Sequence, residues 1–337
     1  MTELFTMSIP EPSAVEFLSE RAQAGGWDGI TFVDSQNLMA DPFIGIAVGA
    51  RVTDRLQFMT GVTNPATRHP AALATAVATA NEIANGRMIC GIGRGDTALF
   101  HLGRKPMPVA EFSARIEELH TYLNGGVVDQ RGFPSRLLWL ERARQPAVPL
   151  DIAASGPKVI AFAARTVERI TFAVGADPSR LAWAIDLART AMKEAGRPDD
   201  AVSFGAYVNV GCHPDLDAAR TMVRGSTAAF AHFSAMPGST GAGLSADDQA
   251  LVAEVGRAYD SNAHLVNSAE HAQVLPDEFI ERFAVIGPPA RCTARLQELV
   301  DLGLDRLVIT GPAFGSNRDH ATTHGELLQH EVIPALR

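Results

Sequence analysis

Hydrophobic residues in this chain occur in short runs that alternate with longer segments of helical periodicity. The short runs have the length of strands, and the longer segments repeat apolar side chains with the spacing of an amphipathic helix. The predicted strands are 4–9, 29–33, 56–63, 88–93, 150–154, 170–174, 202–210 and 306–310. The predicted helices are 13–24, 41–52, 69–85, 109–123, 159–167, 180–195 and 290–302.

The order of these elements indicates an α/β fold. Strands that are buried on both faces and separated by helices pair in parallel, because a parallel neighbour requires a crossover connection. Eight such strands favour a closed (β/α)8 TIM barrel, with an open doubly wound sheet as the alternative. We therefore expect a single domain over residues 1–337.

Two segments fall outside this alternation. Residues 125–141 have the pattern of a hairpin, and residues 233–283 form a long insertion that includes the Gly-rich turn MPGSTGAGL. We expect both insertions to cover the mouth of the barrel, at the carboxyl ends of the strands.

Composition and charge exclude several classes of function. The net charge is −9 and no basic run is present, so nucleic-acid binding is not expected, because it requires clustered Lys and Arg. The N-terminus lacks the pattern of a secretory signal, and no apolar stretch approaches the roughly 18 residues of a membrane span. Cys90, Cys212 and Cys292 are odd in number and far apart, which indicates reduced thiols. We expect a cytoplasmic protein.

The barrel prediction supplies a list of candidate site residues, because chemistry in such barrels takes place at the carboxyl ends of the strands. Several of these ends are rich in glycine, which lets a flat ligand lie against the backbone. The strand ends hold Met7 and Ser8; Asp34 and Ser35; Gly61, Val62, Thr63 and Asn64; Gly93, Arg94, Gly95 and Asp96; Ala153, Ala154, Ser155, Gly156 and Pro157; Val174 and Gly175; residues 209–212; and residues 311–314.

Two Gly-rich turns raise the question of phosphate binding. GIGRGD at 91–96 has the spacing G-x-G-x-G, which differs from the dinucleotide-binding fingerprint. The turn AASGP at 153–157 lies between a strand and a helix, so free backbone N–H groups and the helix dipole make it a candidate anion site. The alternative for 153–157 is a plain turn in which Gly and Pro only set the geometry.

Four stretches together carry a family resemblance. They are TGVTNPATRHP, GRMICGIGRGDTALFHLGRKP, DIAASGPK and AVIGPPARCTARLQELVDLGLDRLVITGP. With these motifs the chain resembles the bacterial luciferase-like superfamily, and within it the coenzyme F420-dependent branch that includes methylenetetrahydromethanopterin reductase. The resemblance covers most of the chain and is weakest between about 213 and 283.

The resemblance implies a (β/α)8 barrel that holds coenzyme F420, an 8-hydroxy-5-deazaflavin, or a flavin. It implies a cis peptide between Gly61 and Val62 that forms a bulge behind the central ring, with Thr63 beside it and the Asn64 amide at the ring's polar edge. It also places the coenzyme phosphate at 153–157, completed by Val174 and Gly175.

The same resemblance assigns chemistry to the loop after the fourth strand. Arg94 and Gly95 pass beside the coenzyme, and Asp96 lies near the reactive centre as proton donor or base. The alternative for Asp96 is a cap of the helix or turn that begins at Thr97. His101 is a further candidate for proton relay, although a lone His is more often structural.

Departures from the family pattern limit what the resemblance carries over. Related deazaflavin enzymes often have Asp-His at the end of the second strand, where this chain has Asp34 and Ser35. The reductase has an acid at the end of the first strand, where this chain has Met7 and Ser8. The resemblance therefore does not predict that this protein acts on a sugar phosphate or on a pterin.

The sequence as a whole predicts a coenzyme F420-dependent oxidoreductase that moves a hydride between the deazaflavin and a small organic substrate. Asp96 is the expected proton donor, with Asp34 and His101 as further catalytic candidates. Asp34 and Asp96 are also expected to bind the cofactor, and the family likeness implies a homodimer. The alternatives are a monooxygenase that uses reduced FMN and oxygen, and a barrel that binds flavin without turnover. His320 and His324 lie one helical turn apart without a third ligand of suitable spacing, so no metal is expected.

Overall fold

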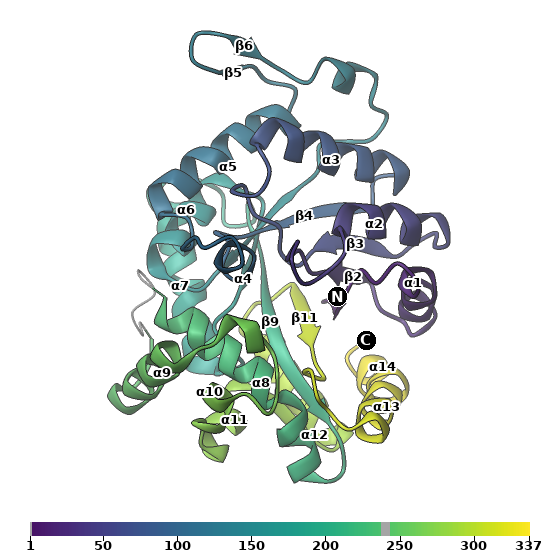
Figure 1. Cartoon of the computed structure of the whole chain (residues 1–337), viewed down its shortest axis with the longest axis vertical. Helices are drawn as coiled ribbons and strands as arrows, with labels where there is room; N and C mark the ends of the chain where they lie inside the picture. Colours follow the sequence, from purple (N-terminus) through teal and green to yellow (C-terminus); the bar gives the residue numbers. More distant parts are fainter. Residues whose placement is uncertain (1, 237–242) are drawn as a thin grey trace. The chain divides into compact units, whose positions relative to one another are not determined.

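The computed structural model describes residues 2–236 and 243–337. Parallel strands alternate with helices along the chain in the order of a (β/α)8 barrel, the predicted fold class (Figure 1). Contacts divide the chain into two compact units. The N-terminal unit comprises residues 7–153 and 166–169, and the C-terminal unit comprises residues 1–6, 154–165 and 170–337.

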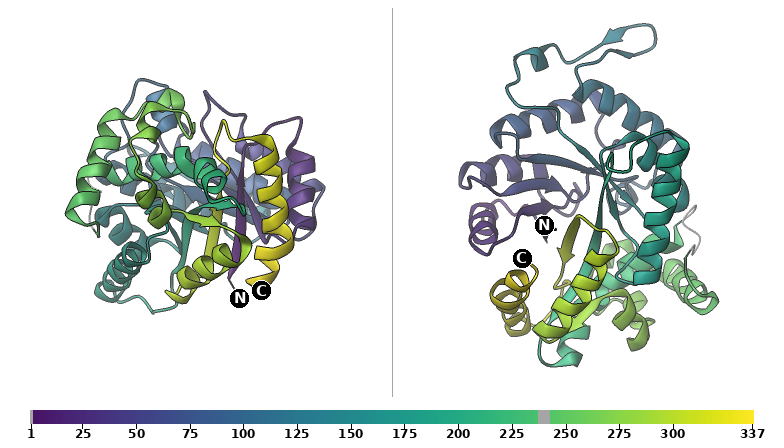
Figure 2. Two further views of the ribbon diagram at one scale, coloured as in Figure 1. Left: turned by 90° about the horizontal axis from the view of Figure 1, so that it is seen from below. Right: turned by 180° about the vertical axis from the view of Figure 1, so that it is seen from behind.

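The N-terminal unit is built on four parallel strands in the order β2-β3-β4-β7. Its helices α1, α2, α3 and α5 follow one another along the outside of this sheet (Figures 1 and 2). The strands are β2 (Gly29–Phe32), β3 (Gln57–Thr60), β4 (Met88–Ile92) and β7 (Leu150–Ala154). The helices are α1 (Val15–Ala24), α2 (Pro42–Arg51), α3 (Pro70–Ile83), the short α4 (Thr97–Phe100) and α5 (Val109–Leu123).

The C-terminal unit contains the strand order β10-β9-β11-β1, and β8 also pairs with β9. The strands are β1 (Glu3–Ser8), β8 (Arg169–Phe172), β9 (Ser203–Cys212), β10 (Val285–Gly287) and β11 (Arg306–Thr310). The longer helices are α6 (Pro157–Thr166), α7 (Pro178–Glu194), α8 (Leu216–Ala235), α9 (Ala246–Ala258), α12 (Pro289–Asp301) and α13 (Arg318–Leu327). Short helices are α10 (Glu270–Gln273), α11 (Asp277–Phe283) and α14 (Ile333–Ala335).

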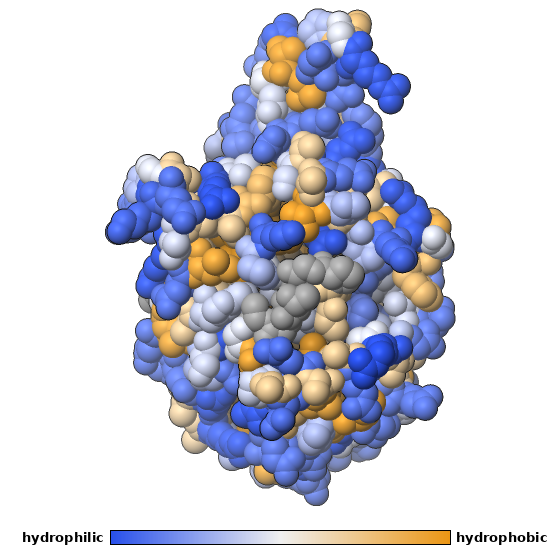
Figure 3. Space-filling view, turned by 90° about the vertical axis from the view of Figure 1, so that its left-hand side faces the viewer, coloured by the Kyte–Doolittle hydropathy of each residue, from blue (hydrophilic) through white to orange (hydrophobic). Residues whose placement is uncertain are grey.

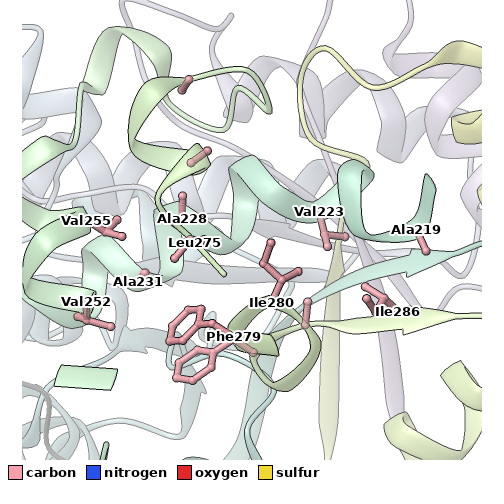
Figure 4. Close-up of a cluster of buried hydrophobic side chains, with 14 residues drawn as sticks. Ala219, Val223, Ala228, Ala231, Val252, Val255, Leu275, Phe279, Ile280 and Ile286 are labelled. Atoms are coloured by element: carbon pink, nitrogen blue, oxygen red, sulfur yellow. The ribbon is translucent and has the colours of Figure 1, made fainter. Parts of the chain in front are cut away.

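Buried apolar side chains join the helices that follow β9 into one cluster within the C-terminal unit (Figure 4). Val223 and Ala231 of α8, Val252 and Val255 of α9, and Phe279 of α11 contribute to it. The rings of Phe279 and Phe283 stack with centroids 4.0 Å apart. This cluster gives the long segment after β9 a core of its own.

The predicted insertions differ from the structure in two respects. Helix α8 continues through Ala235, so the second insertion does not begin at residue 233, and six residues of its Gly-rich turn, 237–242, lie outside the described residues. The hairpin at 125–141 has only two-residue strands, β5 (Val128–Asp129) and β6 (Pro134–Ser135), followed by a 3-10 helix, η1 (Leu138–Arg142).

This hairpin packs on the outer side of α5 instead of over the strand ends (Figure 1). Apolar residues appear on its surface at the top of Figure 3. Phe133 of this hairpin is 69% exposed. A pocket of about 700 Å³ lies between it and α5, lined by His69, Glu111, Ala114, Arg115, Glu118, Asp129, Gln130 and Arg131.

Within the described part of the chain, no helix combines the length and apolar composition that crossing a membrane requires.

Candidate functional site

A buried carboxylate lies at the end of β2 in the N-terminal unit. Asp34 is 6% exposed and accepts hydrogen bonds at Oδ2 from Thr63 Oγ1 and from Arg68 Nη1, both at 2.6 Å. Arg68 also donates from Nη2 to Asp41 at 2.8 Å. Because Asp41 caps α2 through its other oxygen, the ends of β2 and β3 and the start of α2 share one polar network.

The peptide between Gly61 and Val62 is cis, as the resemblance implied. Strand β3 ends at Thr60, three residues before its predicted end, and Thr63 rejoins β4 as a single bridge to Ile92. Only glycine fits at position 61, because a Cβ there would lie 2.1 Å from Thr31 Oγ1.

Asn64 is fixed by the turn that follows it. It is 1% exposed, and its Oδ1 accepts from the backbone N–H groups of Ala66 and Thr67. The oxygen is therefore committed to the turn, and the amide nitrogen is the end that can meet a ligand. Gly95 comes close to it, since a Cβ on Gly95 would lie 3.4 Å from Asn64 Cβ.

The loop after β4 contains Arg94, Gly95 and Asp96. Asp96 occupies the N-cap position of α4, but its side chain makes no capping hydrogen bond to that helix, so the structure does not support the alternative of a cap. Arg94 donates from Nε to Met107 O at 2.6 Å. Burial lowers the pKa of Arg94, and nearby Asp96 partly offsets this effect.

His101 ends α4, where its backbone N–H donates to Thr97 O. Its Nε2 is buried and has no hydrogen-bond partner among the described residues. The ring packs edge-on against Phe100 with centroids 5.4 Å apart. A role for His101 in proton transfer stays a prediction.

Thus the predicted residues of the second to fourth strands come together in the N-terminal unit. Asp34 contacts Thr63, and the Gly93 and Gly95 backbones approach Val62 and Asn64.

The turn after β7 has the features of an anion site at a helix N-terminus. Gly156 O accepts from the N–H groups of Val159 and Ile160, so α6 begins directly after this turn. The first turn of α6 has no acidic residue, whereas α2, α7 and α8 are each capped by an Asp side chain. Ser155 Oγ donates to Phe233 O at 3.3 Å, which ties the turn to α8.

The end of β8 lies beside this turn, since Ala173 N donates to Ala154 O at 2.9 Å. Gly175 has a φ of +84°, and a Cβ there would lie 2.6 Å from the ring of Phe283. Val174 O accepts from Nη1 of Arg180, which is fully buried. Burial lowers the pKa of Arg180 to about 10.

Sequence reasoning missed the partners that hold these residues. In the sequence Arg68 looks like an ordinary charged residue of a loop, yet it contacts Asp34. Thr31, Phe283 and Arg180 carried no signal, because a Thr in a strand or a Phe in a helix looks like ordinary core.

His324 belongs to the interior of the C-terminal unit. Its Nδ1 accepts from Cys212 N at 3.0 Å, and burial, followed by nearby His213, lowers the pKa of His324 to about 4. His320 instead packs against the ring of His213, with centroids 4.8 Å apart. No group of three or more potential ligand side chains suited to a metal ion occurs in residues 2–236 and 243–337.

Comparison with known proteins identifies relatives along nearly the whole chain. The 5,10-methylenetetrahydromethanopterin reductase of Methanolobus tindarius is 28% identical over 317 residues, which is 93% of each chain. The F420-dependent glucose-6-phosphate dehydrogenase of Microbacterium testaceum is 28% identical over 334 residues, 95% of this chain and 88% of the relative.

The solved structures show that the fold is shared. The coenzyme F420 dependent tetrahydromethanopterin reductase from Methanopyrus kandleri matches with a TM-score of 0.76 and 22% identity, covering 100% of this chain and 99% of that one. The model of the family described as luciferase-like monooxygenase matches residues 6–306. With the strand-end geometry above, this match confirms the predicted resemblance: the chain belongs to the luciferase-like monooxygenase family.

Proposed function

We propose that this protein is a coenzyme F420-dependent oxidoreductase that transfers a hydride between the deazaflavin and a small organic substrate. The observation that carries the proposal is the arrangement at the ends of β2, β3 and β4, where Asp34 and Asn64 are buried and hydrogen-bonded and Gly61 lies against Thr31. Relatives that match nearly the whole chain bear names of F420-dependent enzymes, which supports the same cofactor here.

The residues present fit such a coenzyme. Glycines at 61, 93 and 95 let the backbone pack closely against Thr31, Val62 and Leu99, where a Cβ would collide. The strand ends thereby present closely packed backbone on which a flat ring can lie. In the C-terminal unit, the start of α6 offers N–H groups without a competing acidic residue in its first turn, which suits a phosphate. In this proposal residues 153–157, Val174 and Gly175 hold the phosphate.

Each polar residue of the N-terminal unit then has a role. Asn64 donates to an acceptor at the edge of the ring, Arg94 lines the loop beside it, and Asp96 gives or takes the proton that accompanies hydride transfer. The bound coenzyme supplies the hydride chemistry itself, and the protein binds, orients and excludes water. His101 remains a candidate for relay to Asp96.

The experiment that tests the proposal is a binding titration of the purified protein with coenzyme F420 and, in parallel, with FMN. We expect coenzyme F420 to bind at least about tenfold more tightly, and the D96N variant to retain binding while losing turnover with an accepted substrate. Tighter binding of FMN, with oxygen consumption by the reduced flavin, would instead favour the monooxygenase alternative. Binding of either cofactor without turnover of any candidate substrate would favour the non-catalytic alternative.

We also propose that the protein is a cytoplasmic homodimer that pairs through α2, α3 and α5, the helices that follow the second to fourth strands. Ile44 on α2 is 68% exposed and Ile83 on α3 is 41% exposed, so this layer carries apolar surface that a second copy can bury. Sedimentation equilibrium checks this proposal: the wild type should be a dimer, and I44E should shift the equilibrium toward monomer. A monomeric wild type would contradict it.

A further inference from the structure

Arg68 ties together the two ends of the segment between β2 and α2. Its Nη1 lies 2.6 Å from Asp34 Oδ2, and its Nη2 lies 2.8 Å from Asp41 Oδ2. The guanidinium also lies over the ring of Phe43, with Cζ 5.1 Å from the ring centroid. Both terminal nitrogens of Arg68 therefore hold carboxylates within the N-terminal unit.

The two hydrogen bonds to Asp34 leave one of its oxygens available. Thr63 Oγ1 and Arg68 Nη1 both donate to Oδ2, and Oδ1 accepts no hydrogen bond from the described residues. The side chain of Asp34 is 2% exposed, so an ionised carboxylate there requires the charge of a partner. An ionised Asp34 has acceptor capacity at Oδ1 and no proton to donate.

The charged and titratable groups around Asp34 make Arg68 the cation that balances it. Burial alone would lower the pKa of Arg68, but Asp34 and Asp41 outweigh this effect and raise it above its usual value. On β4, burial raises the pKa of the nearby Cys90 thiol to about 12, so this group stays neutral. Asp151 on β7 has a cationic partner of its own, because Arg169 Nε lies 3.9 Å from Asp151 Oδ2.

We propose that Arg68 is a positioning residue that keeps Asp34 ionised, with Oδ1 turned to accept a hydrogen bond from the bound coenzyme. Asp34 then acts as an acceptor in coenzyme binding, and the proton of the reaction passes through another group, for which Asp96 is the candidate. This inference rests on the coenzyme F420-dependent function proposed above and specifies how one part of that site works.

Single substitutions in the whole chain test the contacts of Arg68, Asp41 and Asp34 one at a time. R68M removes the charge, and R68K keeps a charge but loses the paired geometry. D41N removes only the ion pair between Arg68 and Asp41, because Oδ1 of Asp41 caps α2 while Oδ2 contacts Arg68. D34N replaces the acceptor, since Thr63 and Arg68 hold the amide oxygen and turn the NH2 group toward the ligand. R115M breaks the Arg115–Glu118 pair on α5 and is the matched control.

The first measurement is the affinity for coenzyme F420 by fluorescence titration between about pH 5.5 and about pH 8. We expect R68M to bind about tenfold or more weakly than the wild type at the acid end and to recover as pH rises, because its buried carboxyl group takes up a proton. D34N should bind the coenzyme weakly at every pH, and the D34N/R68M double variant should bind only a little more weakly than D34N. R68K, D41N and R115M should keep the profile of the wild type.

The second measurement needs no coenzyme. In ¹³C NMR of protein labelled at Asp carboxyl carbons, the Asp34 signal is the one lost in D34N. We expect it to titrate at higher pH in R68M than in the wild type and to be unchanged in R115M. An unchanged titration in R68M, or an R68M affinity with the pH profile of the wild type, would overturn the inference. Failure of the wild type to bind coenzyme F420 would instead refute the proposed function, while the NMR result still tests Arg68.

Discussion

At the scale of single residues, the end of β3 is defined by a close approach between two strands. Gly61 lies against Thr31 of β2, and the Thr31 hydroxyl has no hydrogen-bond partner among the described residues. A side chain at position 61 therefore meets a buried oxygen at a distance that real Cβ atoms do not tolerate.

We expect G61A to lower the free energy of unfolding by about 1 to 3 kcal/mol, because the added methyl group forces Thr31 or the backbone to move. T31A alone removes an unpaired hydroxyl and should cost less than about 1 kcal/mol. The G61A/T31A double variant should recover most of the loss. Urea denaturation of all four proteins measures the coupling; strictly additive effects would show that Thr31 is not the obstacle.

At this scale the sequence predicted which residues stand at the strand ends but not what holds them. The contact between Asp34 and Thr63 follows from neighbouring parallel strands. The reach of Arg68 to both Asp34 and Asp41 depends on the path of a loop, and neither composition nor periodicity defines such a path.

At the scale of elements, capping explains where several helices begin. Asp177 precedes α7, and its Oδ1 accepts from the N–H groups of Ser179 and Arg180 at 2.9 and 3.1 Å. Asp41 and Asp215 act in the same way at α2 and α8. The predicted start of α2 at Asp41 was correct to one residue because Asp-Pro is a strong start signal.

We expect D177A to lower the free energy of unfolding by about 1 kcal/mol, because two N–H groups at the start of α7 lose their acceptor. D177N keeps an acceptor oxygen and serves as the control, so its free energy of unfolding should fall clearly less. Thermal and urea unfolding measure the stability of both variants. A loss in D177N equal to that in D177A would indicate that the charge of Asp177, and not the cap, matters at this helix.

Elements that the pattern did not reveal share a physical reason. Helix α8 has a polar side only in its first half, at Asp217, Arg220 and Arg224, whereas every residue from 225 to 231 is buried, so the second half lacks a helical alternation of polar and apolar residues. Strand β10 has only three residues, too few for a periodic signal. By contrast, β7, β11 and α5 were predicted with their observed bounds because each is a well-delimited apolar or amphipathic segment.

At the scale of the whole molecule, acid stability depends on a buried imidazole. His324 of α13 is 3% exposed and has a pKa of about 4, lowered by burial and by His213, against an ordinary value of 6.5. Since the folded state binds the proton less readily than the unfolded chain, stability is lost as pH falls from about 6.5 toward about 4.

We expect protonation of His324 to lower the free energy of unfolding by up to about 3 kcal/mol over this pH interval. In H324N an amide oxygen can still accept from Cys212 N, so this variant should be less stable at neutral pH yet lose less on acidification. H330N changes an exposed histidine and is the control. Urea midpoints at about pH 7 and about pH 4.5 provide the measurement; equal acid losses in the wild type and H324N would contradict this account.

The contact between Phe283 and Gly175 links two segments that are distant in sequence. The ring of Phe283 lies against Gly175, and the backbone carbonyl oxygen of Phe283 accepts a hydrogen bond from Ala176 N at 2.9 Å. Helix α11, which ends at Phe283, thereby fixes the conformation of the turn after β8. In the evolution of this chain, a change in the length or packing of α11 would reshape that turn without any substitution in it, so the two segments are expected to diversify together.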